Sequence, residues 1–146
     1  MRFILVAAIA VVTPPSTPAF AQTPAAPAAL IGEWRGESTC TNLVLAPACK
    51  DETIRYVFSA VRAAPARLHL VADKLVGGKF EPMGEFDVDY SPAARVWRYD
   101  FETRQPMKLR WEFKLDGASL SGVIVVRDSG EILRRVSARR AKAGID

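Results

Sequence analysis

Residues 108–117 read Lys-Leu-Arg-Trp-Glu-Phe-Lys-Leu-Asp-Gly, and this stretch contains the most regular pattern in the chain. Charged and apolar residues alternate at every position from Lys108 to Leu115, which is the spacing of a β-strand with one buried face. The Asp116-Gly117 pair that follows is typical of a tight hairpin turn. We therefore expect a strand here and an antiparallel partner directly after it.

The same alternation recurs in seven further stretches between Ile31 and Arg140, and short turn sequences separate them. The predicted strands cover about residues 31–39, 52–61, 67–74, 79–90, 96–102, 108–115, 119–127 and 131–140. Because every connection is short, strands that follow one another in sequence are expected to pair in space. The sequence therefore predicts an all-β fold, an antiparallel up-and-down (meander) barrel of about eight strands.

One predicted strand departs from simple alternation. Pro82 and Gly84 interrupt the segment 79–90, and proline cannot donate the hydrogen bond that a central strand needs. We expect a β-bulge or a sheet edge at this point.

The N-terminus has the three parts of a secretory signal peptide. Met1-Arg2 gives a positive start, residues 3–12 are apolar, and Ala19-Phe20-Ala21 is a small-x-small cleavage site. The apolar run is too short to span a bilayer. We therefore expect a signal peptide over residues 1–21 and a periplasmic or secreted product that does not span the membrane.

The rest of the chain is expected to divide into three parts. Residues 22–30 are rich in alanine and proline, so we interpret them as a disordered leader. Residues 31–142 carry the alternation and are expected to form one barrel domain, followed by a tail over residues 143–146. A domain of this size can bury enough surface to fold without a metal, and the sequence predicts no cofactor.

The chain has two cysteines, Cys40 and Cys49, both after the expected cleavage site. An even number of cysteines in an exported protein indicates a disulfide, and two thiols allow one intramolecular pairing. Two cysteines without a nearby histidine cannot fill the coordination shell of a zinc ion. Their spacing also differs from the C-x-x-C of catalytic redox pairs. We expect a structural disulfide that joins the first predicted strand to the second.

Residues that could carry catalysis lie on the predicted outer face of the barrel. His69, the only histidine, shares a face with Arg67 and Asp73. The carboxylate pairs Glu33/Glu37 and Asp87/Asp89 also point outward, where they would be solvated and would not share a cleft. We therefore expect no metal site and no catalytic site, and predict that the protein is not an enzyme.

Aromatic residues dominate the predicted inward face. Either these rings fill the barrel completely, or some of them line a pocket for an apolar or aromatic small molecule. Tryptophan and tyrosine combine apolar area with a hydrogen-bonding tip. The candidate ligand-binding residues are therefore Tyr56, Trp97, Tyr99 and Trp111.

The C-terminal segment is basic, and the whole chain has a formal net charge of +4. The basic residues concerned are Arg127, Arg134, Arg135, Arg139, Arg140 and Lys142. Such a patch attracts polyanions, but export excludes nucleic acid as the partner. The remaining interpretations are an anionic envelope surface, an acidic partner protein, or a solvated wall with one buried arginine.

The element Gly32-Glu33-Trp34 at the start of the first predicted strand resembles the G-x-W element of lipocalin-like, calycin-type barrels. The resemblance implies that Trp34 closes one end of the barrel and is covered by a basic residue of the last strand. Arg139 and Arg140 are the candidates, and Arg140 has the inward parity. The chain is shorter than typical lipocalins and has no helix after the barrel.

Two functional hypotheses follow, from different classes of protein. The first is a non-catalytic protein that binds a small apolar or aromatic molecule inside the barrel. The second is a periplasmic protein-interaction or envelope-associated module, similar to an inhibitor, with a filled barrel. A cavity would favour the first hypothesis, whereas a filled barrel with an exposed apolar or basic patch would favour the second.

Overall fold

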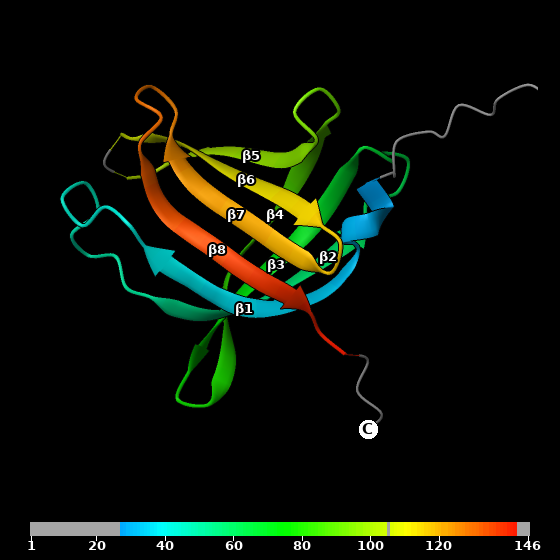
Figure 1. Cartoon of the computed structure of the whole chain (residues 1–146), viewed down its shortest axis with the longest axis horizontal. Coiled ribbons are helices and arrows are strands. Elements are labelled where there is room, and N and C mark those ends of the chain that lie inside the picture. The colour runs from blue at the N-terminus through cyan, green and yellow to red at the C-terminus, as the bar shows by residue number, and fades with distance from the viewer. Residues whose placement is uncertain (1–26, 105, 143–146) are drawn as a thin grey trace, which may run out of the picture.

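Residues 27–104 and 106–142 are described by a computed structural model, in which eight antiparallel strands form a closed barrel in sequential order (Figure 1). The strands are β1 (Gly32–Cys40), β2 (Glu52–Ala60), β3 (Arg67–Val76), β4 (Lys79–Ser91), β5 (Val96–Glu102), β6 (Lys108–Asp116), β7 (Ser119–Val126) and β8 (Ile132–Arg140). Strand β8 pairs with β1 and closes the barrel. The predicted fold class is confirmed, and the strand bounds differ from the prediction by at most two residues.

The expected signal peptide, the first part of the leader and the tail at residues 143–146 lie outside the described residues. The end of the leader does not: residues Pro27–Leu30 form a 3-10 helix, η1, with Leu30 fully buried. The expectation of disorder through residue 30 is therefore wrong for these four residues. The physical reason is that the barrel end offers Leu30 an apolar site, so ordering the turn removes this side chain from water.

Trp34 closes the barrel end that η1 covers. Its ring is fully buried, and its indole N–H donates a hydrogen bond to the Leu30 carbonyl at 2.8 Å. The Arg140 guanidinium lies 4.4 Å from the centre of the ring and donates to the carbonyls of Ala29 and Ile31 at 2.6 Å each. Arg140 pairs with Trp34 in the β1–β8 register. The two residues meet as the inward parity of Arg140 predicted.

Rings and aliphatic side chains fill the middle of the barrel. Phe113 makes edge-to-face contacts with Tyr56 and Phe58, at centroid distances of 5.9 and 5.5 Å. Gly122 leaves room for the Phe113 ring, because a Cβ there would lie 3.0 Å from it. A Cβ at Gly36 would overlap the backbone of Ser137, so this glycine lets β1 and β8 approach closely. Whatever space remains lies toward the barrel ends and the outer wall.

Two irregularities bend the strands. In the β3–β4 ladder, Ala72 pairs with Gly84 and Asp73 with Pro82, so Met83 is left out as a bulge. This confirms the bulge predicted from Pro82 and Gly84. The hairpin beyond it projects below the barrel in Figure 1. The second irregularity leaves Leu133 out of the β7–β8 ladder. No helix among the described residues is long and apolar enough to span a membrane.

We expect Trp34→Ala to lower the free energy of unfolding by about 3 to 5 kcal/mol, because it removes a fully buried ring and the base on which Arg140 rests. Urea denaturation with near-ultraviolet circular dichroism measures this. A loss below about 1 kcal/mol with an unchanged spectrum would show that the ring does not hold the barrel end together.

Candidate functional site

The four candidate ring residues do not share one cavity. Tyr56 and Trp111 line a recess at one end of the barrel, whereas Trp97 lines a cleft at the opposite end. Tyr99 lines a groove on the outer wall between β4 and β5. The structure thus brings together two of the four predicted residues and separates the other two from them.

The recess lies at the barrel end opposite η1, where the β1–β2, β3–β4, β5–β6 and β7–β8 connections meet, and we call this end the mouth. Its volume is about 240 Å³. The lining residues are Ser38, Glu52, Tyr56, Ala72, Met83, Phe86, Phe101, Trp111, Ile124 and Arg134. It is therefore apolar over most of its wall and polar on one side.

Aromatic contacts fix the apolar side of the recess. Trp111 packs edge-to-face on Tyr56, with ring centroids 5.5 Å apart, and against Phe86 at 5.2 Å. Trp111 is only 9% exposed, and its indole N–H has no hydrogen-bond partner in the described part of the chain. A buried donor without an acceptor carries a free-energy cost. The ring that lines the recess therefore carries a buried donor without an acceptor.

Arg134 forms the polar side of the recess. Its Nε donates to the Ser38 hydroxyl at 2.9 Å, and another guanidinium nitrogen contacts a Glu52 carboxylate oxygen at 3.0 Å. The same side chain donates to the carbonyls of Ser38 and Lys50 at 3.0 and 2.9 Å and contacts Cys49 Sγ at 3.2 Å. With 16% of the side chain exposed, Arg134 belongs to the inner wall. It is therefore removed from the expected basic patch.

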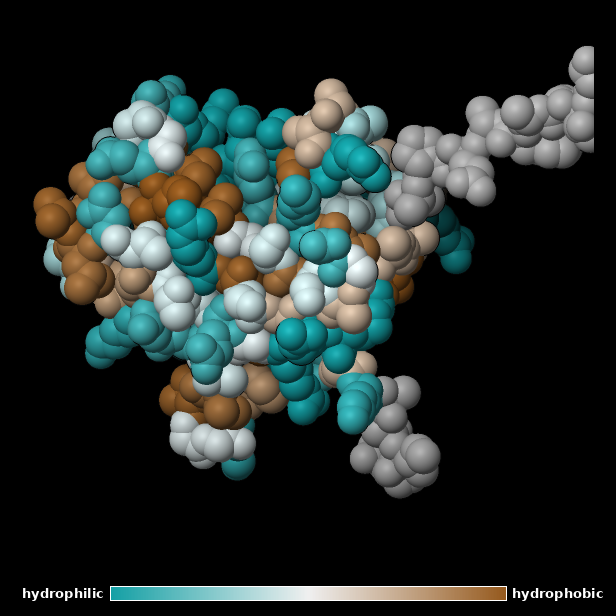
Figure 2. Space-filling view, viewed as in Figure 1, coloured by the Kyte–Doolittle hydropathy of each residue, from teal (hydrophilic) through white to brown (hydrophobic). Residues whose placement is uncertain are grey.

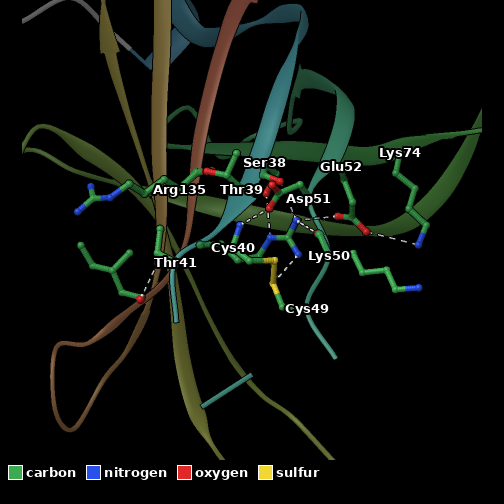
Figure 3. The surroundings of a disulfide bond; sticks show 12 residues. Ser38, Thr39, Cys40, Thr41, Cys49, Lys50, Asp51, Glu52, Lys74 and Arg135 are labelled. Carbon is green, nitrogen blue, oxygen red and sulfur yellow. Dashed lines mark hydrogen bonds and ion pairs between the residues drawn. A yellow bond between two sulfur atoms is a disulfide. The ribbon is translucent and has the colours of Figure 1, made fainter. Parts of the chain in front are cut away.

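The expected disulfide is present between Cys40 and Cys49 and closes the β1–β2 connection next to the recess. The backbone N–H of Cys40 donates to Asp51 Oδ1 at 2.7 Å. Glu52 and Lys74 extend the polar network, with Lys74 Nζ 3.5 Å from a Glu52 oxygen (Figure 3). The disulfide loop and the mouth are thus one connected polar unit.

Tyr56 has a perturbed hydroxyl at the inner end of the recess. Burial raises the pKa of Tyr56 well above its ordinary value, although the neighbouring Arg134 guanidinium acts in the opposite direction. The hydroxyl therefore stays protonated at physiological pH. It can form hydrogen bonds with a ligand, but it is not placed to act as a general base.

Tyr99 lies at the β4–β5 seam beside the recess, where its ring stacks on Phe86 and Phe101, two residues that line the recess. Only three residue pairs join these strands, whereas every other seam of the barrel has at least six. Beyond the Asp89–Arg98 pair the Phe86 and Tyr99 rings stack across the gap, with centroids 4.4 Å apart. The outer groove over this gap, about 820 Å³, is lined mainly by charged residues. Alternation in the sequence gives no signal for where a ladder ends.

Ion pairs occupy the groove. Arg110 donates to both carboxylate oxygens of Asp100, at 2.7 and 3.1 Å, and this hydrogen bonding lowers the pKa of Asp100. His69 Nδ1 lies 2.9 Å from an Asp87 oxygen, and Nε2 lies 3.6 Å from Glu85. These groups point outward, as their parity predicted, but they pair with one another and are not merely solvated. In the described ranges, no cluster of three or more His, Cys, Asp or Glu side chains is arranged to hold a metal.

The C-terminal basic residues divide into three groups. Arg134 and Arg140 serve the two barrel ends, and Arg127 lies 3.5 Å from Asp100. Arg135 and Arg139 are exposed on the outer wall, and Lys142, just after β8, is exposed as well. The inward parity of Arg134 was visible in the sequence, but its contacts with the disulfide loop were not, because they depend on how that loop folds back over β8.

Comparison of the sequence with models of protein families finds no match, and none of the curated proteins is significantly similar to it. The barrel is consistent with a calycin-like fold. That likeness rests on architecture: eight antiparallel strands in sequential order and a buried tryptophan under an arginine of the last strand.

We expect Cys40→Ala to lower the melting temperature and leave the barrel folded. The disulfide closes a short loop, worth about 2.5 to 3 kcal/mol in the chain-entropy model, while the aromatic core does not depend on it. Thermal unfolding followed by far-ultraviolet circular dichroism measures the change, with the reduced native protein as the control. An unfolded variant would show that the loop, and not the core, holds the barrel together.

Proposed function

We propose that this chain is an exported, non-catalytic barrel protein that binds one small, mostly apolar or aromatic molecule in the recess at its mouth. The recess lined by aromatic rings is the observation that supports this most directly; one of these rings, Trp111, has a buried indole N–H with no acceptor among the described residues. A ligand that carries a hydrogen-bond acceptor next to a ring would pair with Trp111 and pack against the same rings.

The size of the recess limits the ligand. A volume of about 240 Å³ corresponds to roughly eight water molecules at their liquid volume, and lies below the usual range for drug-sized ligands. The fitting class is therefore a molecule with a single ring or a short chain. The polar side formed by Arg134 and Glu52 would face the more polar end of such a molecule.

Export and lack of catalysis belong to the same proposal. The disulfide and the signal-like residues 1–21 support an oxidising compartment, the periplasm or the exterior. The placement of His69 on the outer wall, between Asp87 and Glu85, supports a non-catalytic protein, since the only histidine of the chain is held away from the recess.

A second candidate function, a protein-interaction or envelope-associated module, is favoured by exposed apolar residues at the mouth. In the β1–β2 connection Leu43 and Val44 are 58% and 92% exposed, and Leu75, Val76 and Met83 are exposed around the β3–β4 hairpin. Figure 2 shows hydrophobic side chains at the left of the molecule, where the β1–β2 connection lies, and on the hairpin at the bottom. An acidic partner or an anionic surface would also meet Arg135 there.

Tryptophan fluorescence tests the binding function. Titration with short fatty acids, small aromatic acids and porphyrins should give saturable quenching by at least one small ligand and none by porphyrins, which exceed the recess. Trp111→Phe keeps a ring and removes the N–H, so it should weaken binding about fivefold or more at equal folding.

Leu75→Ser at the hairpin tip is the control, because it lies outside the recess and should leave the affinity unchanged. Absence of saturable quenching with every small ligand would overturn the binding proposal. If the double variant Val44→Ser/Leu75→Ser then no longer bound an acidic partner or an anionic surface that the native protein binds, this loss would support the interaction module.

A further inference from the structure

The barrel has a second cleft at the end opposite the mouth, with a volume of about 410 Å³. It lies between η1, the β4–β5 turn and the end of β6. The lining residues are Ala29, Tyr90, Ala94, Arg95, Trp97, Lys114, Leu115 and Asp116. Unlike the mouth recess, this cleft falls within the ordinary size range of small-molecule sites.

Trp97 and Tyr90 form the aromatic wall of this cleft. The two rings pack 4.9 Å apart at an angle of 49°. Trp97 is only 4% exposed, and its indole N–H, like that of Trp111, finds no acceptor among the residues that the structure describes. The wall is therefore aromatic, and the Trp97 ring carries a buried donor without an acceptor behind it.

Two cations stand at the rim of the cleft without partners. Arg95 comes from the β4–β5 turn and Lys114 from β6, and neither forms an ion pair with any carboxylate in residues 27–104 and 106–142. Some cations of the outer wall are paired instead: Arg67 with Asp89, and Arg98 with Glu112. Asp116 is the one carboxylate lining the cleft, so the rim has an excess of one positive charge.

We propose that this cleft binds a small monocarboxylate with a short apolar body. The carboxylate would pair with the Arg95 guanidinium, which suits its planar geometry, and with Lys114. The apolar body would lie against Trp97, Tyr90 and Leu115. A single negative charge matches the excess at the rim, whereas a dianion such as hydrogen phosphate would meet repulsion from Asp116.

The site is independent of the proposed binding function, because Trp97 and Trp111 line cavities at opposite ends of the barrel. This makes the two proposals separable in one experiment. The chain has three tryptophans, so an ¹H–¹⁵N spectrum contains three indole signals. Trp97→Phe and Trp111→Phe assign them.

Titration with benzoate at millimolar concentration should shift the Trp97 indole signal saturably, while the Trp34 signal stays in place. Benzyl alcohol, which has the ring without the charge, and inorganic phosphate, which has the charge without the ring, should bind at least about tenfold more weakly. A response of the Trp111 signal reports on the mouth recess alone, so either site can fail without the other.

Arg95→Gly is the decisive variant. Arg95 has a φ of 56°, a left-handed conformation that glycine adopts without strain, so the variant removes the guanidinium and preserves the turn. It should weaken benzoate binding about tenfold, and Lys114→Gln should also weaken it. Lys79→Gln, an exposed cation on the β3–β4 hairpin, is the matched control and should change nothing.

Three results would overturn the proposal. The first is a Trp97 signal that does not move with benzoate. The second is equal affinity for benzoate and benzyl alcohol, or for benzoate and phosphate. The third is unchanged benzoate affinity in Arg95→Gly when that variant melts at the native temperature.

Discussion

The pairing of β1 with β8 is the constraint on which the rest of the barrel depends. Close approach at Gly36 brings the two strands together, and two inward arginines of β8 then complete the two barrel ends. Arg140 covers Trp34 and donates to the carbonyls of Ala29 and Ile31, whereas Arg134 ties the disulfide loop to the mouth. Because both arginines sit on one strand, the seam that closes the barrel also fixes the walls of its recess and of its closed end.

Alternation in the sequence was sufficient to predict the strands, the meander order and the inward position of Trp34 and Arg140, because these depend only on local parity and short connections. The disulfide followed from the cysteine count. The position of the candidate rings could not be predicted in the same way. Parity states that Trp97, Tyr99 and Trp111 face inward, but not at which height of the barrel, nor that the β4–β5 ladder ends below Tyr99.

The interior is mostly apolar, and few of its buried side chains carry polar atoms. Phe58 and Phe113 carry no polar atoms, while Tyr56, Trp97 and Trp111 each have one polar tip. Leu30 shows the same logic from outside the strands: a residue from an alanine- and proline-rich segment becomes ordered because the barrel end needs an apolar plug. The expected basic patch is smaller than predicted, since Arg134 lies in the inner wall and Arg140 covers Trp34.

The short β4–β5 ladder is the seam of the barrel with the fewest paired residues. A seam with many backbone hydrogen bonds opens only if they break together, whereas the β4–β5 seam is held by three residue pairs and by the ring pairs Phe86–Tyr99 and Tyr90–Trp97. Phe86 lies at this seam and lines both the outer groove and the mouth recess. If the barrel widens, we therefore expect it to do so first at this seam, where the fewest residue pairs have to separate.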